Sequence, residues 1–298
     1  MRFAIVLITV LVMFACQSVT SEQRSMPMTK AIQANGTTLT YEEQGTGTPV
    51  VFLHGGFADH RIWEAQRKAV ASRYRFIAPT LRYFGTAPWP DNGERFSQET
   101  HVADTAAFIR ELKVGPVYLV GRSYGAYTAA IVALRYPELV SGLVLNEPPA
   151  ASLLTTDAEK AVLAADVKEM LPLQAAAKAG SINEATRLFA DWTNANPGGF
   201  DALPADVQRM HLDNARTVPL QLTARSIPVS CEQLAQLRIP VSITKGEFGR
   251  AYFKLIADAM HRCIPGAELT VIKGARHGAP TEQPEAFNEL LLAFLPRP

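Results

Sequence analysis

The sequence has little net charge, few cysteines and no apolar run long enough for a membrane span. Lys and Arg total 29 against 28 for Asp and Glu, a net charge of +1 with no basic block, so no nucleic-acid partner is indicated. It contains no metal-binding cluster, dinucleotide loop or Gly-Lys-Ser/Thr phosphate loop, so it indicates no metal and no cofactor. The 298 residues are 48% hydrophobic, which is enough for one large α/β domain.

The N-terminal end differs in composition from the rest of the chain. Arg2 precedes an apolar stretch at 3–15 that is shorter than the ~20 residues needed to span a bilayer. This pattern predicts an export signal at 1–16 and a polar linker at 17–30. The four residues ending at Cys16 resemble a bacterial lipobox, which would make Cys16 a lipidation site; ordinary cleavage a few residues later is the alternative. We therefore expect an exported bacterial protein, periplasmic or anchored as a lipoprotein.

Two further cysteines, Cys231 and Cys263, lie far along the chain. In an exported protein such a pair is compatible with a disulfide. Two buried thiols fit equally well, because the sequence does not show whether their Cα atoms come close enough to be bridged.

The stretch that organises the chain is an apolar run at 117–120 followed by Gly121-Arg122-Ser123-Tyr124-Gly125 and a helix-forming segment. This order predicts a strand, a sharp turn and a helix. Gly-x-Ser-x-Gly is typical of a nucleophile elbow, in which glycines permit a tight turn and the serine hydroxyl is exposed in strained geometry. Ser123 is therefore the first candidate for a catalytic nucleophile.

A second apolar run, at 50–53, ends in His54-Gly55-Gly56-Phe57. Glycines at the carboxyl end of a buried parallel strand let backbone N–H groups turn toward a ligand in the crevice above the sheet. Gly56 is the first candidate for an oxyanion donor and Phe57 the second. His54, beside the glycine turn, is interpreted as a structural hydrogen-bonding group rather than a proton-transfer residue.

Strand-like and helix-like segments alternate over most of the chain, with buried strands expected at 143–145, 239–244 and 268–272. From about 151 to 230 the strand signal is replaced by alanine- and leucine-rich helical segments. The alternation predicts an α/β fold with a mostly parallel sheet covered by helices on both faces. We expect one domain at 31–298 with an all-helical cap inserted at about 151–230.

Several motifs in a fixed order resemble the α/β-hydrolase superfamily across roughly residues 31–298. They are His54-Gly55-Gly56 after a strand, the Gly-x-Ser-x-Gly elbow, a helical insertion, and Gly274-x-x-His277 near the C-terminus. The segment 56–63 is similar to the same region in small bacterial esterases, lactonases and cofactor-free haloperoxidases. The resemblance implies a triad of serine, acid and histidine in that chain order. Ser123 and His277 fill two of these roles, and the backbone N–H groups of Gly56 and Tyr124 would form the oxyanion hole.

The third triad member departs from the usual pattern. Many members of the superfamily carry Asp in a Gly-x-x-Asp arrangement after the strand that follows the insertion, and here that position is Gly249. Some relatives, including haloalkane dehalogenases, place the acid after the preceding strand, where this sequence has Glu147. We expect Glu147 to be the acid and keep Glu247 as the alternative.

The resemblance implies a serine hydrolase that cleaves a small, fairly apolar ester or lactone through an acyl-enzyme. A serine at the elbow argues against dehalogenation, for which an Asp nucleophile would be expected. The alternatives are a cofactor-free perhydrolase or haloperoxidase, and a low-turnover ligand-binding protein on the same fold. The insertion is expected to roof the crevice, with three aromatic residues as pocket walls: Phe189, Trp192 and Phe200.

Overall fold

The computed structural model describes residues 28–89 and 91–297. The expected export signal, the lipidation site Cys16 and most of the expected linker lie outside the described residues. Met28 to Lys30, at the end of that linker, already belong to the first strand. Within the described part of the chain, no helix is both long enough and apolar enough to cross a membrane.

Eight strands form one sheet in the order β1-β2-β4-β3-β5-β6-β7-β8. β1 pairs antiparallel with β2 and β2 antiparallel with β4, whereas every other neighbouring pair is parallel. The mostly parallel sheet expected from the sequence is thus confirmed. The strands are β1 (Met28–Ala34), β2 (Thr37–Gln44), β3 (Pro49–Leu53), β4 (Arg75–Pro79), β5 (Val117–Arg122), β6 (Val140–Asn146), β7 (Val241–Gly246) and β8 (Glu268–Ile272).

Alternate side chains of the central strands enter two separate cores. Val51 and Leu53 pack on one face, under α2 (Gln98–Leu112), α3 (Tyr124–Arg135) and α10 (Ala251–Cys263). Val50 and Phe52 pack on the other face, under α1 (Glu64–Val70) and α12 (Pro284–Phe294). A sheet buried on both faces explains why these strands read as continuous apolar runs rather than as alternating patterns.

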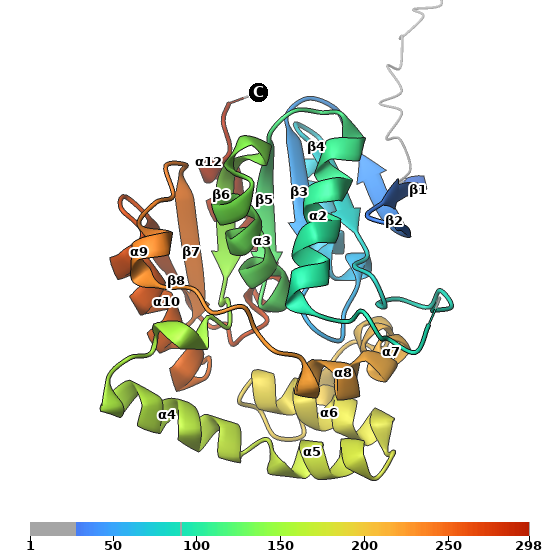
Figure 1. Cartoon of the computed structure of the whole chain (residues 1–298), viewed down its shortest axis with the longest axis vertical. Coiled ribbons are helices and arrows are strands. Elements are labelled where there is room, and N and C mark those ends of the chain that lie inside the picture. Colours follow the sequence, from blue (N-terminus) through green and yellow to red (C-terminus); the bar gives the residue numbers. More distant parts are fainter. Residues whose placement is uncertain (1–27, 90, 298) are drawn as a thin grey trace, which may run out of the picture.

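The segment between β6 and β7 is helical, and its helices between residues 157 and 223 lie across the carboxyl ends of the parallel strands (Figure 1). A disulfide joins Cys231 to Cys263 and so ties the last short helix of this segment to the end of α10. The remaining helices are α4 (Asp157–Lys168), α5 (Leu171–Lys178), α6 (Ile182–Thr193), α7 (Ala205–Asp213), α8 (Val218–Thr223), α9 (Cys231–Leu234) and α11 (Ala279–Glu282).

Candidate active site

Ser123 occupies the sharp turn between β5 and α3. Its backbone has φ 51° and ψ −118°, a left-handed conformation that is rare outside glycine. A Cβ at Gly121 would lie 2.4 Å from the Cα of Ala126, and a Cβ at Gly125 would lie 2.2 Å from the carbonyl oxygen of Leu53. Both positions therefore exclude a side chain, as expected for an elbow.

His277 contacts a buried carboxylate. It lies in the loop between β8 and α11, and its Nδ1 is 2.5 Å from Oε2 of Glu147, which directly follows β6. The other carboxylate oxygen of Glu147 accepts a hydrogen bond of 2.8 Å from the backbone N–H of Gly246. The ring of Phe253 stacks on the imidazole with centroids 4.1 Å apart. The imidazole is therefore positioned by the carboxylate of Glu147 at its edge and by the ring of Phe253 on its face.

Glu247 lies elsewhere. It is exposed, and its carboxylate accepts a hydrogen bond of 2.9 Å from the N–H of Gly274 instead of contacting His277. Gly249, which occupies the usual acid position, packs against the other candidate: a Cβ there would lie 2.7 Å from Oε1 of Glu147. The absence of a side chain at 249 leaves the space that the Glu147 carboxylate fills.

Three non-glycine residues at the same edge of the sheet have strained backbone conformations. Phe57 (φ 42°), Ser123 and Glu147 (φ 44°) all have positive φ, and they follow β3, β5 and β6 respectively. Non-glycine residues in this region persist only where the surrounding structure holds them, and they are enriched at functional sites.

Two backbone N–H groups are available beside Ser123. That of Gly56 has no hydrogen-bond acceptor in the part of the chain that is described. Tyr124 is the first residue of α3, so its N–H lacks an acceptor within the helix. The cap approaches closely here, since a Cβ at Gly56 would lie 2.1 Å from Oε1 of Gln221 in α8.

A cavity of about 250 Å³ connects these groups. Ser123, His277, Gly56 and Tyr124 all line it, and the cap closes it from the other side. Phe189 and Trp192 are pocket walls, as expected from the sequence. The expectation for Phe200 was wrong, because this side chain is buried within the cap, where the Arg187 guanidinium lies over its ring.

The comparisons with known proteins agree with this architecture. Residues 48–181 match the family model described as the alpha/beta hydrolase fold. An esterase structure from Exiguobacterium antarcticum superimposes with a TM-score of 0.73 at 24% identity, over 90% of this chain and 99% of that one. The chain is 25% identical to the 2-(acetamidomethylene)succinate hydrolase of Mesorhizobium japonicum, over 87% of this chain and 91% of that protein.

The chain has the α/β-hydrolase fold. A higher identity, 40%, is confined to 109 residues of BpoC from Mycobacterium tuberculosis, which is named as a non-heme bromoperoxidase; the match covers 36% of this chain and 40% of that protein. Within the described residues of this chain, no group of His, Cys, Asp and Glu side chains is arranged to hold a metal ion.

Sequence reasoning missed Asn146, the last residue of β6. Its backbone oxygen accepts a hydrogen bond of 2.7 Å from the N–H of Ser123, and its side-chain amide donates one of 3.1 Å to the carbonyl oxygen of His277. Thr244 Oγ1 donates to its side-chain oxygen at 3.0 Å. Asn146 thus links the turn at Ser123 to the loop that holds His277. The available signal was a polar residue at the end of a buried apolar strand.

His54 has a structural role, as expected. Its Nδ1 lies 2.8 Å from the carbonyl oxygen of Gly55, and its Nε2 accepts a hydrogen bond of 3.0 Å from the N–H of Leu81. A neutral imidazole with the proton on Nδ1 satisfies both contacts. Burial lowers the pKa of His54 to about 4, so the neutral form predominates at pH 7.

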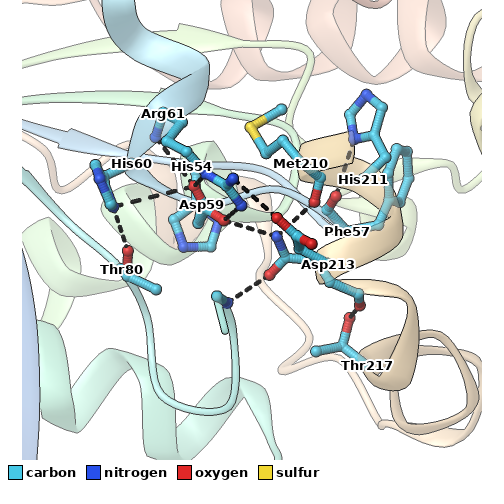
Figure 2. A network of polar contacts seen from close by, with 12 residues as sticks. His54, Phe57, Asp59, His60, Arg61, Thr80, Met210, His211, Asp213 and Thr217 are labelled. Carbon is cyan, nitrogen blue, oxygen red and sulfur yellow. Dashed lines mark hydrogen bonds and ion pairs between the residues drawn. The ribbon is translucent and has the colours of Figure 1, made fainter. Parts of the chain in front are cut away.

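A buried polar network attaches the cap to the loop after β3 (Figure 2). Arg61 donates three hydrogen bonds to the carboxylate of Asp59, two from its guanidinium and one from its backbone N–H, and the amide of Asn214, which follows α7, donates a fourth at 2.8 Å. The Asn214 side-chain oxygen accepts from the N–H of Gly85 at 2.6 Å. Burial alone would raise the pKa of Asp59, but the hydrogen bonds from Arg61 and Asn214 lower it to about 2.

We expect Asn214→Ala to destabilise the protein by about 1–3 kcal/mol, because it leaves the N–H of Gly85 without a partner in a buried site and removes one of the hydrogen bonds to the Asp59 carboxylate. Urea unfolding at pH 7 measures the change. Asn183→Ala changes an exposed residue of α6 and is the matched control. It should lower the free energy of unfolding by at most about 0.5 kcal/mol. Equal stabilities of the two variants would show that the network does not attach the cap.

Proposed function

We propose that this protein is a serine hydrolase that cleaves a carboxylic ester or lactone of a small, largely apolar substrate through an acyl-enzyme. The observation that carries the proposal is the contact of His277 with the buried Glu147 at the wall of the cavity that also exposes Ser123. The N–H groups of Gly56 and Tyr124, which have no acceptor among the described residues, and the aromatic cap walls support it. Similarity to an esterase fold agrees with the proposal without identifying the substrate.

In the proposed mechanism, Ser123 Oγ attacks the carbonyl carbon of the ester while His277 takes the hydroxyl proton. The carbonyl electrons move to the oxygen, and the N–H groups of Gly56 and Tyr124 stabilise the resulting oxyanion by about 3 kcal/mol each. The oxyanion then collapses, the bond to the alcohol breaks, and His277 returns the proton to the leaving oxygen. Water attacks the acyl-enzyme in the same way and releases the acid, while Glu147 holds the imidazole in the required tautomer.

Covalent labelling tests the nucleophile. A fluorophosphonate probe should label the wild-type protein, and Ser123→Ala should abolish the label, because an activated serine attacks the phosphorus, displaces fluoride and becomes phosphonylated. Ser226 also lines the cavity and provides the control: Ser226→Ala should label as the wild type does. A folded wild-type protein that fails to label would contradict the proposal and favour a low-turnover ligand-binding protein.

A cofactor-free perhydrolase or haloperoxidase is the second candidate, favoured by the local similarity to BpoC. It would use the same groups, with peroxide in place of water at the acyl-enzyme. Peroxide-dependent halogenation and 4-nitrophenyl acetate hydrolysis, measured side by side on one preparation, separate the two activities. We also propose that the protein is exported, with Cys16 as a candidate lipidation site.

A further inference from the structure

The cavity beside Ser123 is positively charged. Among the described residues that line it, Arg122 and Arg225 carry positive charge, and none is Asp or Glu. Glu147 is buried behind His277 and does not line the cavity. A substrate entering this space therefore meets two arginines and no acidic residue among the described residues that line it.

Arg122 is the more informative of the two. It is the residue immediately before the nucleophile, and its side chain is only 7% exposed. Its guanidinium makes no hydrogen bond and no ion pair with any described residue. None of its nitrogen atoms is among the fully enclosed polar atoms of the described chain that lack a partner, so the side chain keeps some accessible surface, and Arg122 is one of the residues that line the cavity.

The two acidic residues that lie near Arg122 accept hydrogen bonds from other groups. Glu147 binds His277 and the N–H of Gly246. Glu282 accepts hydrogen bonds from the N–H groups of Arg276 and Gly278, at 2.6 and 3.2 Å. Both acids attract the Arg122 guanidinium without pairing with it, and burial lowers the pKa of that group.

A buried guanidinium without a partner is costly, because it loses water and gains no counter-ion. Such an arrangement persists where a ligand supplies the missing acceptor. Arginine presents a planar set of donors that matches a carboxylate, and two parallel hydrogen bonds to a carboxylate are stronger than neutral ones.

We propose that the substrate of this hydrolase carries a carboxylate, which Arg122 binds while Ser123 attacks the ester. This inference rests on the proposed serine hydrolase activity and names its substrate class: esters or lactones with an apolar body and an anionic end. Arg225 is exposed at the same cavity and has no hydrogen bond or ion pair with a described residue, so it attracts the anion toward the entrance.

Matched esters test the proposal on the wild-type protein. One series places the charge on the acyl side: 4-nitrophenyl adipate monoester against 4-nitrophenyl hexanoate, which has a methyl group in place of the carboxylate. The other places it on the leaving group: the hexanoate ester of 3-hydroxybenzoate against that of 3-hydroxybenzamide. We expect kcat/KM to be at least about tenfold higher for the anionic ester in one series, and that series identifies the side that Arg122 recognises.

Variants assign the preference to a residue. Arg122→Gln should bring the ratio of the two kcat/KM values close to one, and using a ratio cancels any general loss of activity. Arg238→Gln removes the same charge from an exposed site that does not line the cavity, and it should keep the wild-type ratio. If Arg122→Gln does not fold, Arg122→Lys replaces it, and the ratio should fall because the paired hydrogen bonds are lost.

Two results overturn the proposal: a wild-type protein without a preference in either series, and a folded Arg122 variant that keeps the wild-type ratio. If the protein is labelled by the fluorophosphonate but hydrolyses none of these esters, the carboxylate preference is tested by measuring how strongly ligands protect the protein from labelling. Adipic acid monoamide should then slow labelling at least about tenfold more strongly than hexanamide. A labelled protein without these preferences refutes the carboxylate alone, whereas a protein that is not labelled refutes the hydrolase.

Discussion

Replacement of Glu147 by glutamine is expected to lower kcat for ester hydrolysis by about 10⁴-fold. The N–H of Gly246 donates to Oε1 of Glu147, so the amide oxygen of a glutamine would take that position. Its NH₂ group would then face Nδ1 of His277, where Oε2 now lies. Nδ1 would have to accept, the ring proton would move to Nε2, and the imidazole would no longer be able to take a proton from Ser123.

Glu247→Gln is the matched control for this prediction. It makes the same chemical change in an exposed carboxylate that contacts Gly274 rather than His277, so kcat should remain within about twofold of the wild type. Steady-state kinetics on 4-nitrophenyl acetate compare the three proteins. Full turnover in the Glu147 variant, or a large loss in the Glu247 variant, would contradict the assignment of the acid.

The sheet and the elbow could be predicted because their causes are local. Parallel strands buried on both faces produce continuous apolar runs, such as those that form β3 and β5. The elbow requires glycine at 121 and 125 because backbone atoms of the following helix and of β3 occupy the space of a side chain. Such requirements are visible in a sequence without knowledge of distant contacts.

The cap and the supporting contacts of the site could not be predicted in the same way. Trp192 and Phe200 are both aromatic cap residues, yet one faces the cavity and the other the interior of the cap. Which side each takes depends on how α6, α7 and α8 pack, and the helical pattern alone does not specify that packing. Asn146 was missed for a similar reason, since its partners come from distant segments of the chain.

The structure explains the glycine at position 249, which the sequence alone does not. Glycine at 249 reads as the loss of a carboxylate when the sequence is considered alone. In the structure, the missing side chain makes room for Glu147, whose carboxylate lies where a Cβ at 249 would intrude. The two positions therefore form one arrangement, in which the carboxylate that contacts His277 follows β6 rather than β7.

We expect the protein to lose stability steeply between pH 6.5 and about pH 4, because three buried histidines stay neutral in the fold. Burial lowers the pKa of His54 to about 4, of His101 to about 3 and of His211 to about 4. In the unfolded chain each would titrate near its usual value of about 6.5. Their contribution is thus fully present above pH 6.5 and is lost as the pH falls toward the folded values.

Near pH 5, unfolding should take up close to one proton at each of the three sites, so the free energy of unfolding should fall by about 4 kcal/mol per pH unit. Urea unfolding at pH 7, 6 and 5 measures this slope. His101 donates to and accepts from neutral partners, the carbonyl of Arg82 and the hydroxyl of Tyr124, which a glutamine side chain can also satisfy. His101→Gln should therefore reduce the slope by about a third, whereas His261→Gln, at an exposed position, should leave it unchanged. A free energy of unfolding that is equal at pH 7 and pH 5 would show that these imidazoles are not held neutral by the fold.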